Sequence, residues 1–143
     1  MDTAYAKNLE TGTRVQQFQK TQINHISLVK KILSVFFIVV PITAGADKFF
    51  NILTDWTKYL HPLINDLSGI SASLLMSIAG IVEIAAGILV LLNRRIGAYV
   101  VAAWLTAIAL QLLAGWMYVD VAVRDLVMAA AALSLGLLSE EDK

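Results

Sequence analysis

The sequence contains no cysteine among its 143 residues. This excludes disulfide bonds, thiolate metal ligands and thiol–disulfide exchange. Its two histidines, His25 and His61, are far apart in the chain, so a histidine-rich metal site is not expected. No nucleophile–base pair or phosphate-binding loop can be recognised either. The sequence leaves enzymatic activity open, but it gives no support for an enzyme that acts on its own.

Charge is also scarce. Charged residues make up 15% of the chain, compared with about a quarter in ordinary globular domains. The formal net charge is zero, so a nucleic-acid partner has no electrostatic support. The hydrophobic residues, 58% of the total, fall into four separated runs. This pattern favours a membrane protein over a soluble helical bundle.

The four runs predict four transmembrane helices, at residues 32–53, 71–92, 96–118 and 121–138. Pro41 lies inside the first and should kink it, because proline lacks an amide donor. The short connections after the second and third runs require antiparallel neighbours, so the predicted fold class is all-α, an integral membrane four-helix bundle. A cleaved signal peptide is a rival interpretation of the first run. Against it, nearly thirty mostly polar residues precede that run.

Lysine and arginine near the ends of the spans predict the orientation. Five of them precede the first span, and Arg94-Arg95 join the second to the third. An even number of crossings separates these groups, so both termini are expected on the cytoplasmic side of the membrane. We divide the chain into a polar cytoplasmic tail (1–27), a membrane domain (28–138) and an acidic cytoplasmic C-terminus (139–143). The tail is expected to be partly helical at most.

The connection between the first two spans carries aromatic and apolar residues at helical spacing. Trp56 and Tyr59 belong to this pattern, which predicts a short helix lying along the outer membrane interface. Pro62 indicates a bend there. A plain connecting loop with aromatic anchors is the alternative. Trp116 and Tyr118, at the end of the third span, are expected to be anchors at the same interface.

Glu83 is the one charged residue within the second span. A rise of ~1.5 Å per residue places it near the middle of the bilayer, where insertion scales assign an ionised acidic residue a cost of roughly 2.5–3.5 kcal/mol. Gly80 and Gly87 lie on the same helix face and would let another helix approach closely. Glu83 should therefore face the bundle interior, either protonated or held in an ion pair.

Candidate neighbours of Glu83 come from the outer ends of the other spans, and with it they form a predicted polar intramembrane cluster: Glu83, Lys48, Arg124, Gln111, Asp47 and Asp125. Three roles remain open for this cluster. It could supply interhelical hydrogen bonds, worth about 0.6 kcal/mol each on average. It could form a site for a ligand, a proton or a quinone. It could also contact another subunit.

The order of these features resembles the DoxX family of small four-helix membrane proteins. In that family a first helix typically closes with glycine and lysine, and a second carries a glutamate followed four residues later by glycine. Gly45, Lys48, Glu83 and Gly87 match these positions, within the segments AGADKF and GIVEIAAG. The likeness covers residues 30–138 and leaves out the N-terminal tail.

The resemblance implies an accessory subunit of a quinone-linked membrane redox complex, since the family is named after a subunit associated with a thiosulfate:quinone oxidoreductase. It implies no covalently bound cofactor, but a quinone or lipid near Glu83. The expected partners are the bilayer, a redox subunit or a second copy of the chain. The alternatives are a small proton-coupled transporter that uses Glu83 and a purely structural assembly factor. Related folds use cysteine pairs, which this chain lacks.

Overall fold

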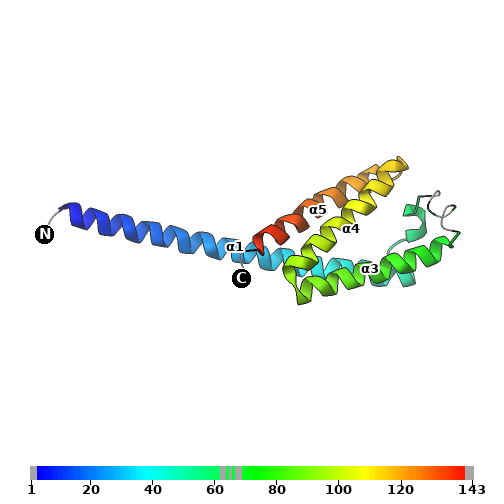
Figure 1. The fold of residues 1–143 in the computed structure, drawn as a ribbon, viewed down its shortest axis with the longest axis horizontal. Helices are drawn as coiled ribbons and strands as arrows, with labels where there is room; N and C mark the ends of the chain where they lie inside the picture. The colour runs from blue at the N-terminus through cyan, green and yellow to red at the C-terminus, as the bar shows by residue number, and fades with distance from the viewer. Residues whose placement is uncertain (1–2, 62–63, 65, 67–68, 141–143) are drawn as a thin grey trace. The chain divides into compact units, whose positions relative to one another are not determined.

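The computed structural model describes residues 3–61, 64, 66 and 69–140, with side chains from residue 12 onward. Its elements in chain order are α1 (Thr3–Phe50), the 3-10 turn η1 (Trp56–Tyr59), α3 (Ala72–Leu92), α4 (Arg94–Ala114) and α5 (Val119–Leu138) (Figure 1). The described residues contain no strand. Four of these helices are long and apolar enough to cross a membrane. The expected all-α class with four membrane-length helices is therefore confirmed for the described part of the chain.

The chain divides into two compact units, Met1–Ile32 and Leu33–Lys143. In the first unit, α1 is already helical from Thr3. The expectation that residues 1–27 are partly helical at most is therefore wrong. Gly12 is the only glycine or proline in this unit, and its Gln, Lys, Arg and Glu residues favour helix. Side chains 12–26 are exposed.

Side-chain caps fix the ends of α3 and the start of α4. The Ser71 hydroxyl accepts a hydrogen bond from the Leu74 amide, 3.4 Å away, at the start of α3. Asn93 ends α3, and its side-chain oxygen accepts a bond of 3.1 Å from the Ile96 amide at the start of α4. Both residues satisfy amides that have no partner within the helix. The predicted bounds of the second span, 71–92, agree with α3.

The other predicted spans differ from the observed helices at their ends. α4 ends at Ala114, four residues before the predicted end of the third span. Trp116 and Tyr118 adopt the left-handed backbone conformation, with φ of 50° and 48°, and this tight connection turns the chain into α5. Pro41 lies inside α1, which continues as a helix on both sides of it.

The described part of the connection between α1 and α3 contains η1. Asp55 caps this turn, because its carboxylate accepts hydrogen bonds from the hydroxyl and the amide of Thr57, at 2.6 and 3.0 Å. These two bonds hold the pKa of Asp55 below its usual value. The bend expected at Pro62 falls outside the described residues.

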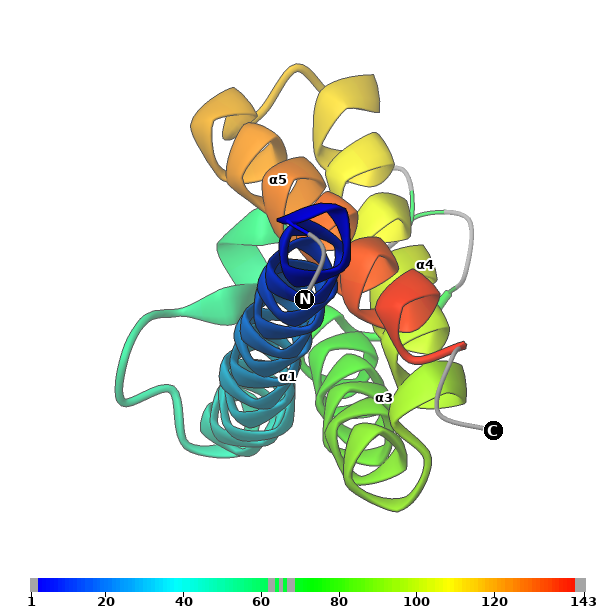
Figure 2. The same ribbon diagram turned by 90° about the vertical axis from the view of Figure 1, so that its left-hand side faces the viewer.

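In the second unit, α1 and α3 lie next to each other (Figure 2). Glycines allow the two helices to touch through their backbones. A Cβ atom on Gly45 would lie 2.6 Å from the carbonyl oxygen of Gly80, and a Cβ atom on Gly80 would lie 2.6 Å from the carbonyl oxygen of Gly45. Gly87 lies against the side chain of Ile42 and the backbone of Ile38. The small residues noted in the sequence thus form the contact between these two helices.

Buried apolar residues hold the four helices together at the end where α3 turns into α4, which we call the arginine end. This cluster comprises Phe37, Ala86, Val90, Ala98, Val101, Ala132 and Leu135. At the opposite end, which we call the η1 end, Ala109, Leu112 and Ala122 form a second cluster with Tyr59 packed against it. Figures 1 and 2 both show α4 and α5 side by side.

Polar contacts close the arginine end. Arg95 and Tyr99 of α4 bind the carboxylate of Glu140, with distances of 3.0 and 2.8 Å. They therefore attach the end of α5 to the start of α4. Glu140 belongs to the acidic C-terminus, whose last three residues fall outside the described part of the chain.

We predict that Gly80→Ala destabilises the bundle by about 1–3 kcal/mol, because the added methyl group would overlap the Gly45 carbonyl and force α1 and α3 apart. The free energy of unfolding in detergent, followed by circular dichroism, measures this loss. The matched control is Gly12→Ala, where the added methyl group meets no atom within 4 Å. A Gly80→Ala protein as stable as the Gly12→Ala control would contradict the backbone contact.

Candidate functional site

The centre of the candidate site is an ion pair between α1 and α3. Lys48 Nζ lies 2.7 Å from Glu83 Oε2, and the two side chains are only 6% and 9% exposed. The glycine contact makes room for them. A Cβ on Gly80 would lie 3.2 Å from Lys48 Cβ, and a Cβ on Gly45 would lie 3.1 Å from Glu83 Cβ. Each glycine therefore leaves space for the charged residue of the opposite helix.

An indole ring lies beside each member of this pair. Lys48 Nζ lies 3.8 Å from the centre of the Trp56 ring, which is a cation–π contact. Trp104 Nε1 lies 3.5 Å from Glu83 Oε1, a long hydrogen bond. Trp56 was predicted only as an interfacial anchor, and Trp104 was not predicted as part of the site. Neither contact could be predicted from the spacing of residues along one helix, because each joins residues on different elements.

Asp47 positions Trp56 rather than Glu83. Its carboxylate accepts a hydrogen bond of 2.7 Å from Trp56 Nε1 and bonds of 3.0 and 3.2 Å from the amides of Ile52 and Leu53. These bonds end α1 and hold the indole ring above Lys48. Asp47 was predicted as a member of the polar cluster, and the structure places it in the support of that cluster.

Gln111 connects α4 to η1. Its side-chain amide donates to the carbonyl oxygen of Tyr59, 2.9 Å away. The Tyr59 ring packs against the Tyr118 ring, with their centres 4.7 Å apart. Three of the four predicted interfacial aromatic residues, Trp56, Tyr59 and Tyr118, therefore contact the site or its supports. Trp116, the fourth, is 81% exposed.

Arg124 pairs with its own helix rather than with Glu83. Its guanidinium lies 2.8 Å from Asp120 Oδ2, and both side chains are about 70% exposed (70% and 72%). Asp125, the next residue, is half-buried. Among the residues that the structure describes, no donor is found on its carboxylate. The two predicted cluster members on α5 thus differ, since Arg124 forms an ion pair at the surface and Asp125 has no contact of this kind with a described residue.

A cavity of about 590 Å³ connects these groups inside the second unit. Its walls come from α1, η1, α3, α4 and α5, and its volume lies within the range of known ligand sites. Five of the six predicted cluster residues line it: Lys48, Glu83, Gln111, Arg124 and Asp125. Aromatic residues Trp56, Tyr59 and Trp104 line it as well, and the rest of its surface is largely apolar.

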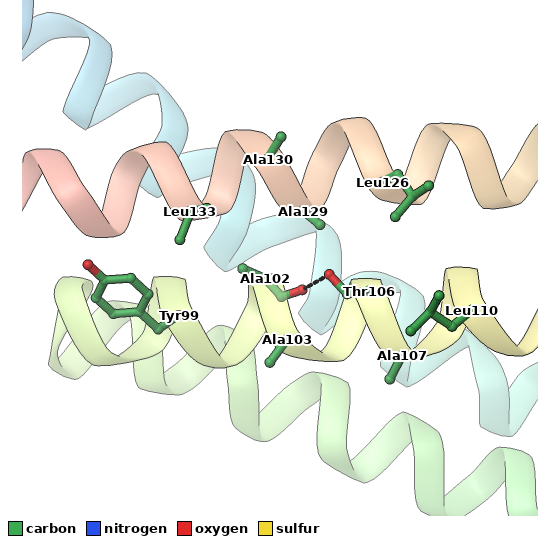
Figure 3. A pocket seen from close by; sticks show the side chains of 10 residues that line it. All are labelled: Tyr99, Ala102, Ala103, Thr106, Ala107, Leu110, Leu126, Ala129, Ala130 and Leu133. Carbon is green, nitrogen blue, oxygen red and sulfur yellow. Dashed lines mark hydrogen bonds between the residues drawn. The ribbon is translucent and has the colours of Figure 1, made fainter.

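A second hollow, of about 600 Å³, lies between α4 and α5 (Figure 3). Its walls are mostly alanine and leucine, and its described lining includes no charged side chain. Thr106 is one of its two hydroxyl-bearing residues, and it donates to the Ala102 carbonyl oxygen of its own helix, 2.8 Å away. This hollow offers packing surface but no polar group free to orient a ligand.

Among the described residues, no group of three or more His, Cys, Asp or Glu side chains could hold a metal ion. No family model, curated protein or solved structure matches the chain. The function is therefore inferred from the geometry of the cavity.

We predict that Glu83→Gln lowers the free energy of unfolding in detergent by about 3–5 kcal/mol, because it leaves the ammonium of Lys48 buried without a counter-charge. The double variant Lys48→Met/Glu83→Leu should recover most of this loss, since it removes both charges. The control is Asp120→Asn, which breaks an exposed pair and should cost less than about 1 kcal/mol. Equal losses for Glu83→Gln and Asp120→Asn would show that the buried pair is no stronger than a surface pair.

Proposed function

We propose that the chain is an accessory protein of the bacterial cytoplasmic membrane that holds an amphiphilic ligand in its cavity and supports a membrane redox enzyme. The observation that carries this proposal is the cavity, with the buried Lys48–Glu83 pair on its wall. A bundle selected only for packing would fill such a space, since empty volume costs stability.

The lining of the cavity favours a ligand with one polar and one apolar part. Toward the η1 end the wall carries charged and amide side chains, including Gln111 and Arg124. Toward the arginine end it is made of Phe37, Val101 and other apolar residues. A quinone or a lipid has this division, and both can reach a membrane-embedded cavity from the bilayer.

The resemblance to the DoxX family supports the accessory role. Two of the four matching positions, Lys48 and Glu83, form the buried pair, and the other two, Gly45 and Gly87, lie at the contact of α1 with α3. In this proposal both termini are cytoplasmic, as the lysine and arginine distribution predicts. The η1 turn then lies along the outer interface, with its aromatic rings at headgroup depth.

A proton-coupled carrier is the second candidate. It is favoured by the presence of two carboxylates, Glu83 and Asp125, on the wall of one cavity, because a carrier needs a titratable group exposed to its substrate. A purely structural assembly factor is the third candidate, but nothing in its role would require the cavity.

We predict that Ala79→Phe weakens binding of decyl-ubiquinone, our quinone probe, by at least about tenfold, because Ala79 lines the cavity and the larger ring would occupy it. The matched control is Ala85→Phe, on the exposed side of the same helix and outside the cavity lining. Binding is measured in lipid nanodiscs by quenching of tryptophan fluorescence, since Trp56 and Trp104 line the site. Equal affinities for the two variants would place the quinone elsewhere.

Two further measurements separate the candidates. Purification from the native membrane together with a flavin or haem subunit is the outcome expected for the accessory protein. Ligand-driven proton flux into proteoliposomes that contain the purified chain alone would favour the carrier. If neither is found and the native membrane yields no bound amphiphile, the accessory proposal fails.

A further inference from the structure

The cavity wall carries two cations and two carboxylates, and these differ in whether a partner touches them. Lys48 and Glu83 neutralise each other at 2.7 Å. Arg124 is already held by Asp120, which is not part of the cavity lining. This leaves Asp125 as the carboxylate on the wall whose charge is not matched by a contact among the described residues.

Asp125 also differs from its neighbours on the wall in hydrogen bonding. The Lys48 ammonium donates to Glu83, and the Gln111 side-chain amide donates to the carbonyl oxygen of Tyr59; each keeps further N–H groups. The Trp104 ring N–H is directed at Glu83. Acceptors remain, since both oxygens of Asp125 and the side-chain carbonyl of Gln111 receive no donor from the described residues. A ligand that donates hydrogen bonds would supply the donor that the Asp125 carboxylate lacks.

The charged groups around Asp125 have both signs. It lies close enough to feel the negative charge of Glu83 and the positive charges of Arg124 and Lys48. An ammonium bound to Asp125 would therefore be attracted by two carboxylates, of which Glu83 already pairs with Lys48. Charges interact more strongly in such a partly water-excluded space than at a surface. The aromatic rings of Trp56, Tyr59 and Trp104 also line the cavity, and ring faces attract cations.

We infer that the head of the cavity's ligand is a protonated amine that binds Asp125, with the apolar tail directed toward the arginine end. The inference rests on the proposed function, because it takes the same cavity as the binding site. Of the two ligands proposed there, a quinone and a lipid, it favours a lipid-like molecule and specifies an amine as its head. The ammonium donates hydrogen bonds to the acceptors that the protein leaves open and compensates the unmatched charge. A quinone head carries only carbonyl acceptors at its ring, so it cannot donate a hydrogen bond to Asp125.

The test compares three probes with the same alkyl chain: octylamine in its protonated form, octanol and octanoate. Their binding to the full chain in nanodiscs of zwitterionic lipid is measured by tryptophan fluorescence. Octylamine should bind about tenfold more tightly than octanol, as expected for one charge-assisted contact. Octanoate should bind more weakly than either.

Matched variants assign the preference to one carboxylate. Asp125→Asn keeps the shape of the side chain and removes its charge, so it should abolish the advantage of octylamine over octanol. Asp66→Asn makes the same change at an exposed carboxylate outside the cavity lining, and should leave that advantage in place. An unchanged octylamine preference in Asp125→Asn, or no preference in the unaltered protein, would overturn the inference.

The outcomes also separate this inference from the proposed function. If octanol binds and Ala79→Phe prevents it, the cavity is a ligand site even where the amine preference is absent. If neither probe binds, or if Ala79→Phe changes nothing, the cavity is not the site and both proposals fail. Displacement of octylamine by phosphatidylethanolamine but not by phosphatidylglycerol would assign the amine to a lipid head. Displacement by neither would assign it to a free amine.

Discussion

The rest of the site depends on the contact of two glycines, because the backbone approach of α1 and α3 at Gly45 and Gly80 is what allows Lys48 and Glu83 to meet. Larger residues at these positions would separate the helices, and two charges would then lie in the apolar interior without each other. An isolated ion there costs several kcal/mol. A buried charge therefore requires its partner, and the partner requires the close helix contact.

The segment between α1 and α3 belongs to the same arrangement. Asp47 binds the ring nitrogen of Trp56, whose ring lies over Lys48. Gln111 binds the carbonyl oxygen of Tyr59 from α4. The η1 turn is thus attached to α1 at one end and to α4 at the other. The loop that joins α1 to α3 therefore forms part of the cavity wall, together with the helices.

Much of the fold can be predicted from the sequence, because apolar runs and side-chain caps are local features. The limits of α3 follow from Ser71 and Asn93, and the inward direction of Glu83 follows from the neighbouring glycines. The partner of Glu83 could not be chosen in advance between Lys48 and Arg124. That choice depends on the depth and rotation of two helices relative to each other, and no local pattern records either. The same holds for the contact of Trp104 with Glu83 and for the supporting role of Asp47.

The sequence left three roles open for the polar cluster. A gain in stability alone does not explain why it contains a buried ion pair beside a cavity. Replacing a buried ion pair with apolar residues of similar volume is often neutral or stabilising. A cavity of about 590 Å³ lowers stability further, because its lining loses the contacts that packed neighbours would supply. Interhelical hydrogen bonding would be served as well by a smaller polar pair in a filled core. The buried pair and the cavity both lower stability, and the cavity wall also carries Asp125, whose carboxylate has no hydrogen bond or ion-pair contact with a described residue. This combination supports the proposal that the cluster forms part of a ligand-binding site, in addition to joining the helices.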